Sequence, residues 1–326
     1  MPPAPAAQDA PGRVRIFGGV LHTDRPLPGL PVAPLGDDGH FPFWTLLTNE
    51  TDGAPAHSPG ARPIGQQPYS SGPVVSLADG ASGPEIVVSD TGCFTIGIDR
   101  HTIVHRAPPQ VDRAAVALDL IGVVLPVAFH LQGAWCMHAS AVQTGTGVIA
   151  FVAARGVGKS TLAAACLQAG CALVADDVVV LRERDGAVTV TPSGVPLRLR
   201  AETARSVGVD AAAADGWGKV RVAGDQSQHA LPLGAIYVLS PAAADAPVTR
   251  ARRGTRASAL ALLSHGKIAE LLGAAGAGEA LERCVTLAAT TALYDLAVPR
   301  DLTLLPAVVQ SLLAWHTAPS SVSIPA

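Results

Sequence analysis

The sequence is short of paired cysteines and of net charge, and both shortages exclude classes of function. Five cysteines are scattered through 326 residues, and none forms a C-x-x-C pair. A disulfide framework or a cysteine-ligated metal site is therefore not expected. The formal net charge is −3, so no overall field attracts a nucleic acid or an anionic membrane. We expect a cytoplasmic protein whose cysteines stay reduced.

The sequence also lacks a recognisable secretion signal. Residues 1–12 are rich in proline and alanine, with no basic region followed by an apolar run, and we expect a disordered tail here. Residues 114–131 imitate a transmembrane span, but they contain Asp119, Pro126 and His130. Charges inside a membrane are costly. We therefore expect a buried helix that bends or ends near Pro126.

Turn residues and apolar runs divide the rest of the chain into two parts. Short runs bounded by Gly, Pro, Asp and Ser predict a small β-rich domain over residues 13–110. Its expected strands are 13–21, 41–47, 74–77, 85–89, 93–98 and 102–105. Residues 50–72 predict a long loop. The second part, residues 111–326, mixes expected strands at 235–239 and 293–298 with expected helices at 257–263, 279–290 and 304–316, which is typical of an α/β fold.

Residues 148–161, VIAFVAARGVGKST, are the most informative segment. An apolar β-branched run leads into a glycine-rich turn, which opens an alanine- and leucine-rich helical stretch. This strand–loop–helix order is typical of a P-loop, whose backbone N–H groups face phosphates. The nucleotide-binding residues would be Ala153, Ala154, Arg155, Gly156, Val157, Gly158, Lys159, Ser160 and Thr161.

Two P-loop side chains have expected roles. Lys159 would reach the β- and γ-phosphates of ATP, and Ser160 would bind Mg²⁺. The pattern asks for glycine at position 153, where this chain has Ala153. Alanine restricts the backbone but removes no N–H donor. The alternative is an ordinary helix start with Ser160 near its cap.

Two adjacent carboxylates follow the P-loop. Asp176 and Asp177 interrupt the apolar run of residues 173–181, as expected of a buried strand with a site at its end. Two charges there are expensive unless a cation or hydrogen bonds compensate for them, and Mg²⁺ is such a cation. Neighbouring strand residues face opposite sides, so one Asp would face the metal and the other the substrate. The alternative is two solvated aspartates.

His138 precedes the P-loop strand in a predicted hairpin. Residues 135–142 are followed by Gly145 and Gly147 and then by the P-loop strand. On these grounds alone, a lone strand histidine is usually a satisfied core residue, and a functional role is the alternative.

Taken together, these segments resemble the catalytic domain of HPr kinase/phosphorylase and its relatives. That family has a His-x-Ser element, a P-loop, a helix, a glycine and a VADD strand. Here the order is residues 137–140, the loop 153–160, Gly170, and residues 174–177. The resemblance covers roughly residues 115–300 and is specific only in its first part.

The resemblance implies an α/β P-loop kinase domain, like that of phosphoenolpyruvate carboxykinase. The small β-rich domain predicted over residues 13–110 precedes it. It implies a kinase that uses ATP and Mg²⁺ to phosphorylate a serine hydroxyl. The N-terminal region and the segment after the aspartates depart from the genuine HPr enzyme. Divergent relatives act as tailoring kinases on precursor peptides, including those of lasso peptides, so the implied acceptor is a peptide or protein serine.

Site residues carry over from the family by position. Asp176 or Asp177 would take the proton of the acceptor serine, and the other would lie near Mg²⁺. The implied metal ligands are Ser160, Asp177 and Glu202, and His138 would position the transferring phosphate beside Lys159. Glu202 is equally well interpreted as an acid favoured by a helix N-terminus.

Two basic segments have open roles. Residues 216–221 place Lys219 and Arg221 beside Trp217. One of these cations would approach the phosphates or the substrate. The alternative is that the segment forms a solvated hairpin. Residues 250–256 are arginine-rich. They would hold an acidic or phosphorylated partner, or they would form a solvated loop. Formation of a homo-oligomer is left as an open possibility by the sequence. The alternative functions are a nucleotide-binding module without transfer activity and a kinase of small alcohols.

Overall fold

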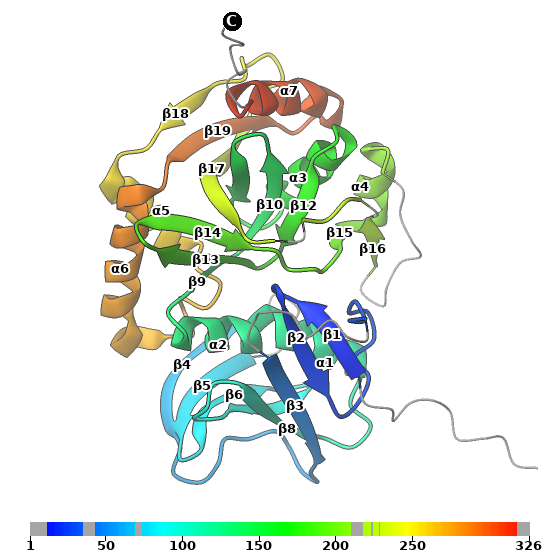
Figure 1. Cartoon of the computed structure of the whole chain (residues 1–326), viewed down its shortest axis with the longest axis vertical. Helices are drawn as coiled ribbons and strands as arrows, with labels where there is room; N and C mark the ends of the chain where they lie inside the picture. Colours follow the sequence, from blue (N-terminus) through cyan, green and yellow to red (C-terminus); the bar gives the residue numbers. More distant parts are fainter. Residues whose placement is uncertain are drawn as a thin grey trace, which may run out of the picture.

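The computed structural model describes residues 12–34, 43–68, 74–209, 218–222, 224–227 and 229–317. The tail expected at residues 1–12 lies outside these ranges except for Gly12, and so do the first two residues of the strand expected at 41–47. The described chain has a mixed α/β fold with two large sheets (Figure 1).

The N-terminal sheet has eight strands in the order β1-β2-β3-β8-β7-β6-β5-β4. Their bounds are β1 (Gly12–Ile16), β2 (Gly19–Thr23), β3 (Phe43–Glu50), β4 (Arg62–Pro68), β5 (Val74–Gly80), β6 (Gly83–Val88), β7 (Gly92–Ile96) and β8 (Thr102–Ala107). Two expectations were wrong. The strand expected at 13–21 is a hairpin, because Phe17 and Gly18 take positive φ angles of 47° and 71° and make a two-residue turn. The loop expected at 50–72 contains β4, which pairs with β5.

The apolar stretch after this sheet is one long helical segment. It runs through α1 (Arg113–Asp119), a π-helical turn (Leu120–Val124) and α2 (Leu125–Leu131). Of the two expected outcomes at Pro126, an end of the helix was wrong: Pro126 lies in the first turn of α2, where its missing N–H costs little, and the segment continues to Leu131. Residues 113–131 are long and apolar enough for a membrane span, but 67% of that window is buried inside the protein.

This helical segment lies between the two sheets (Figure 1). The Phe129 ring makes edge contacts with Phe17 and Trp44 of the N-terminal part, at centroid distances of 5.1 and 5.3 Å. On its other side the Arg182 guanidinium lies 5.5 Å from the same ring. One hydrophobic core therefore continues from the N-terminal sheet into the second part of the chain.

The second sheet has nine strands. The path is β12-β10-β11-β17-β14-β13-β9, with β19 beside β17 and β18 beside β19. The bounds are β9 (Trp135–Met137), β10 (Ala139–Thr144), β11 (Gly147–Val152), β12 (Ala172–Asp176), β13 (Val179–Arg184), β14 (Ala187–Thr191), β17 (Leu231–Ala242), β18 (Arg250–Arg252) and β19 (Leu293–Pro299). A separate pair consists of β15 (Leu197–Arg200) and β16 (Lys219–Val222). The strands expected at 235–239 and 293–298 lie within β17 and β19.

Helices cover the second sheet. They are α3 (Lys159–Gln168), α4 (Ala201–Ser206), α5 (Thr255–Ser264), α6 (Gly273–Thr290) and α7 (Leu305–Trp315), with a 3₁₀ turn (Leu302–Leu304) before α7. The three helices expected after residue 250 lie within or close to α5, α6 and α7. Helices α3 and α7 pack on one face of the strands around β11 (Figure 1).

The P-loop strand β11 is central because both of its faces are apolar. Val148 and Ala150 belong to the core shared with the N-terminal sheet, while Ile149 and Phe151 belong to a second core under α3 and α7. A strand buried on both faces has a continuous apolar sequence.

All five cysteines of the chain are buried free thiols.

Candidate active site

The loop after β11 leads into α3 through two glycines with positive φ angles. Gly156 and Gly158 take φ angles of 83° and 114°, a region that glycine enters without strain. Gly158 caps the N-terminus of α3, and Lys159 is the first helical residue. Ala153 is buried and does not take a positive φ angle. Its methyl group therefore costs no backbone strain, which accounts for alanine where the sequence pattern asks for glycine.

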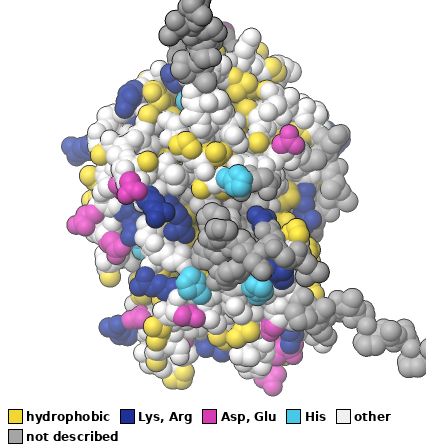
Figure 2. Space-filling model, viewed as in Figure 1, with side chains coloured by type: hydrophobic (Ala, Val, Ile, Leu, Met, Phe, Trp, Pro, Cys, Tyr) yellow, Lys and Arg dark blue, Asp and Glu magenta, His cyan; other side chains and the backbone are white. Residues whose placement is uncertain are grey.

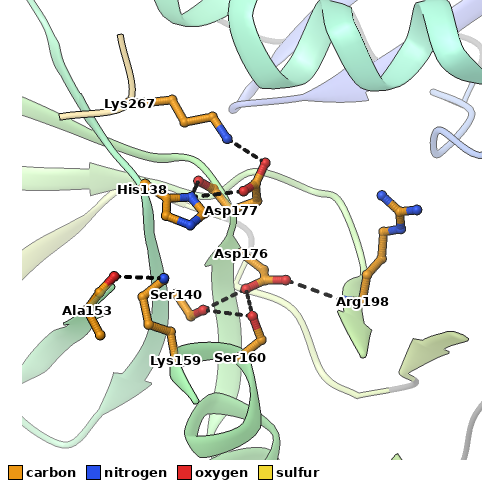
Figure 3. Close-up of polar contacts among 9 residues, drawn as sticks. All are labelled: His138, Ser140, Ala153, Lys159, Ser160, Asp176, Asp177, Arg198 and Lys267. Carbon is orange, nitrogen blue, oxygen red and sulfur yellow. Dashed lines mark hydrogen bonds and ion pairs between the residues drawn. The ribbon is translucent and has the colours of Figure 1, made fainter. Parts of the chain in front are cut away.

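The Lys159 side chain folds back over this loop. Its Nζ donates a hydrogen bond to the Ala153 carbonyl at 3.0 Å (Figure 3). Burial lowers the pKa of Lys159, while the carboxylates of Asp177 and Asp176 act to raise it. A buried ammonium with one carbonyl partner gains when an anion comes within reach.

The remaining loop positions are more open. Ala154, Arg155 and Gly156 are exposed, and Val157 and Thr161 are partly buried. The middle of the loop, residues 154–156, is therefore open to solvent.

Asp176 ends β12 and joins the P-loop to the preceding hairpin. Its Oδ1 accepts a hydrogen bond from Ser160 Oγ at 2.9 Å and another from Ser140 Oγ at 2.6 Å (Figure 3). The Arg198 backbone N–H donates to Oδ2 at 3.4 Å. The β10–β12 register sets Ser140 directly opposite Asp176. Two hydroxyls from different elements thus converge on one carboxylate oxygen.

Asp177 faces a different set of partners. Its Oδ1 lies 3.0 Å from His138 Nδ1 and its Oδ2 lies 2.8 Å from Lys267 Nζ (Figure 3). Withdrawal from water acts to raise the pKa of Asp177, but Lys267 and His138 outweigh it and hold that pKa well below its usual range. Asp177 is therefore a carboxylate anion at neutral pH.

The backbone separates the two aspartates. The continuous strand expected at 173–181 was wrong, because Asp177 has a φ angle of 67° and the chain breaks into β12 and β13 there. A non-glycine residue in this region is uncommon and is typical of functional sites. The expected separation of the two side chains is found, and the break in the strand produces it.

His138 lies at the junction of β9 and β10. Its backbone N–H donates to the His265 carbonyl at 2.8 Å, and the Lys267 N–H donates to the Cys136 carbonyl at 2.8 Å. Residues 265–267 therefore run beside β9 and deliver Lys267 to the site. Between them, a β-carbon at Gly266 would lie 2.5 Å from Trp135, so this close approach requires glycine.

Lys267 is the residue that sequence reasoning missed. It is a lone lysine, 90 residues after Asp177, and no motif surrounds it. The only local signal is the adjacent Gly266 after an apolar helix, which fits a helix end equally well.

The metal ligands implied by the family resemblance are not brought together. Ser160 contacts Asp176, while Asp177 contacts Lys267 and His138. Glu202 is exposed in the first turn of α4, as expected of an acid at a helix N-terminus. Within the described ranges, no three His, Cys, Asp or Glu side chains are grouped closely enough to hold a metal ion.

The two basic segments have different surroundings. Lys219 is near enough to Lys159 to lower the pKa of that ammonium, whereas Trp217 lies outside the described residues. In the second segment, Arg250 stacks on Tyr294 with its Cζ 4.6 Å from the ring centroid, and Arg253 pairs with Asp295 at 2.6 Å. These two arginines hold the C-terminal part of the chain together.

No protein-family model and no curated protein sequence matches the chain. A solved structure of the Hpr(Ser) kinase/phosphatase from Coxiella burnetii is similar over 56% of this chain and 95% of that chain, at 12% sequence identity and a TM-score of 0.30. A likeness this distant carries no conclusion about activity, because one fold hosts many chemistries. Function has to be argued from the site residues.

Proposed function

We propose that this protein is a cytoplasmic kinase that uses ATP and Mg²⁺ to phosphorylate a serine hydroxyl on a peptide or protein. The observation that carries the proposal is that two adjacent carboxylates have different contact partners. Asp176 accepts a hydrogen bond from Ser160 of α3, whereas Asp177 is paired with Lys267 and His138. Phosphoryl transfer needs a metal-side carboxylate and a hydroxyl-side carboxylate.

ATP phosphates would lie against the loop 153–158 and the N-terminus of α3. The backbone N–H groups there and the helix dipole favour negative charge. Lys159 is tethered to the Ala153 carbonyl and would exchange that partner for phosphate oxygens. Such a contact between ions is stronger than the carbonyl contact it replaces.

The donor atoms around Ser160 fit Mg²⁺. A hydroxyl and a carboxylate oxygen lie 2.9 Å apart at the start of α3, and hard oxygen ligands of this kind suit the ion. Mg²⁺ usually takes one or two protein oxygens, with phosphates and water completing its shell, so a cluster of three acids is not required. We therefore assign the metal to Ser160 and Asp176, in place of the implied set with Asp177 and Glu202. When bound, Mg²⁺ would neutralise charge on the β- and γ-phosphates.

Asp177 is the base in this proposal. A residue that accepts the proton of an attacking hydroxyl must be ionised and within reach of it. Its low pKa supplies the first condition, and its half-exposed carboxylate supplies the second. His138 and Lys267 are positioning residues that fix this carboxylate from two sides.

A direct test is transfer of labelled γ-phosphate from ATP to serine-containing peptides, comparing wild type with Lys159→Ala. Removing the ammonium should weaken ATP binding tenfold or more, since hydrogen bonds to charged groups contribute about 1.5–3 kcal/mol. A folded Lys159→Ala protein with unchanged ATP affinity and transfer would contradict the proposal. ATP binding by wild type without transfer to any serine or small alcohol would favour the nucleotide-binding module.

A further inference from the structure

The β15–β16 pair carries four positive charges on two short strands. Arg198 is directly opposite Arg221, and Arg200 is directly opposite Lys219. Residues directly opposite each other in an antiparallel pair share a face, and like charges in that position destabilise the sheet. Two such pairs in succession concentrate positive charge on one face of β15 and β16, and an anion bound at that face would be attracted to it.

The opposite face of this pair fixes the direction of the charges. Leu197, Leu199, Val220 and Val222 are buried in the core beneath α3. Side chains alternate across a strand, so the four cations point away from that core. In Figure 2, Lys and Arg side chains are spread over this face of the molecule.

A cleft opens beside this charged face. Its volume is about 130 Å³, and Arg198 and Arg221 line it together with residues of α1 and of the segments 28–30 and 195–196. The wall is otherwise apolar: Leu30, Ala117, Ile121 and Val195 contribute to it. A cavity of ~150 Å³ accommodates a benzene-sized group. This cleft is therefore the right size for one apolar side chain next to an anion.

Gly29 sets the position of Arg221 at the cleft. A β-carbon on Gly29 would collide with Nη2 of Arg221, and Gly29 itself takes a φ angle of 89°. The guanidinium thus lies directly against the glycine backbone.

Arg198 connects the cleft to the candidate active site. Its backbone N–H donates to Asp176 Oδ2 at 3.4 Å, and its side chain extends away from Asp176 (Figure 3). Arg198 thus both lines the cleft and contacts Asp176. A chain with a side chain in the cleft would therefore lie next to a residue that contacts Asp176.

We propose that this cleft anchors the acceptor peptide through an apolar side chain next to an acidic residue. The apolar group would fill the space against Ala117 and Ile121, and the carboxylate would pair with Arg198 and Arg221. Guanidinium groups bind carboxylates with two parallel hydrogen bonds. The inference rests on the proposed kinase function only in naming the bound peptide as the phosphate acceptor.

The test measures peptide binding without requiring transfer. Labelled peptides carry alanine at the acceptor position, and leucine and aspartate are placed around it in every order. One matched set replaces the aspartate by asparagine. A second matched set replaces the leucine by serine. Fluorescence anisotropy compares wild type, Arg221→Gln, Ala117→Leu and a control, Arg252→Gln, whose exposed arginine lies on β18. If Ala117→Leu does not fold, Ala114→Leu on the same helix and in the same cleft replaces it.

Wild type should bind the best leucine–aspartate peptides about tenfold more tightly than either matched set, because charge-assisted bonds are the strong ones. Arg221→Gln should lose the preference for aspartate, the filled-cleft variant should lose the preference for leucine, and Arg252→Gln should keep both. Equal binding of all sets by wild type, or an unchanged aspartate preference in Arg221→Gln, overturns the proposal. Phosphate transfer is measured separately, on the same peptides with serine at the acceptor position. Transfer without these binding preferences overturns only the proposed role of the cleft. These binding preferences without transfer overturn only the proposed kinase activity.

Discussion

Asp176 and Asp177 are adjacent in the chain, yet among the described residues their carboxylates share no hydrogen-bond or ion-pair partner. Asp176 accepts hydrogen bonds from Ser160 and Ser140, whereas Asp177 contacts His138 and Lys267. The left-handed backbone at Asp177 makes this divergence possible. It gives two chemically similar groups different electrostatic surroundings, which is how paired carboxylates acquire separate roles.

Replacing Lys267 should shift the pH dependence of phosphoryl transfer. Lys267 and His138 hold the pKa of Asp177 well below its usual range, so the base stays ionised down to low pH. In Lys267→Met the pKa of Asp177 should rise, and the acid limb of the kcat profile should move to higher pH. Arg256→Met removes an exposed charge from α5 and should leave the limb in place.

The loss of stability in Lys267→Met should also depend on pH. A depressed folded-state pKa stabilises the protein above the unfolded pKa of the group, and this contribution is lost as pH falls through the folded value. Lys267→Met should lose stability at neutral pH and show a smaller deficit in acid. A deficit equal at all pH values, together with an unmoved acid limb, would refute the assigned role of Lys267.

Ser160→Ala and Ser140→Ala should separate metal binding from local hydrogen bonding. Both hydroxyls donate to Asp176 Oδ1, but only Ser160 belongs to the P-loop helix. Ser160→Ala should therefore raise the Mg²⁺ concentration needed for half-maximal transfer by about tenfold, in line with loss of a charge-assisted contact. Ser140→Ala should change it by less. Titration of Mg²⁺ at saturating ATP measures both, and equal shifts would argue against Ser160 as a ligand.

The sequence predicts the local parts of the site better than their assembly. The strand–loop–helix order around Lys159 and the hairpin before it depend on apolar alternation and glycine, which are local signals. The contact of Asp177 with Lys267 spans 90 residues, and no periodicity encodes it. The strand break at Asp177 was missed because its apolar neighbours continue through it, and only the backbone angle shows the change of direction.

Elsewhere in the fold, the same distinction holds. The helical segment continues past Pro126, because the π-helical turn before it shifts the hydrogen-bond register, which sequence patterns do not reveal. The cleft beside Arg198 and Arg221 was equally invisible, since it requires the N-terminal part, α1 and the β15–β16 pair to meet. Strands such as β17 and β19, with strong apolar runs, were placed correctly.

Phe129→Ala should destabilise both parts of the chain together. This ring is buried and contacts Phe17, Trp44 and Arg182 from the two sheets. Truncating a buried phenylalanine costs about 3–5 kcal/mol, so the free energy of unfolding in urea should fall by that amount in one transition. Val285→Ala, at an exposed position of α6, should change it by about 0.5 kcal/mol or less. Two separate transitions in wild type would contradict a shared core.

The central claim is that Asp177 accepts the acceptor proton while Asp176 serves the metal. Asparagine keeps the shape of aspartate but cannot take a proton or offer a full charge. Single-turnover transfer of labelled γ-phosphate to a serine peptide, with ATP binding measured on the same samples, tests it most directly. The account predicts that both Asp176→Asn and Asp177→Asn abolish transfer, with Mg²⁺-dependent ATP binding retained in Asp177→Asn and weakened in Asp176→Asn. Transfer at wild-type rates by Asp177→Asn would contradict it.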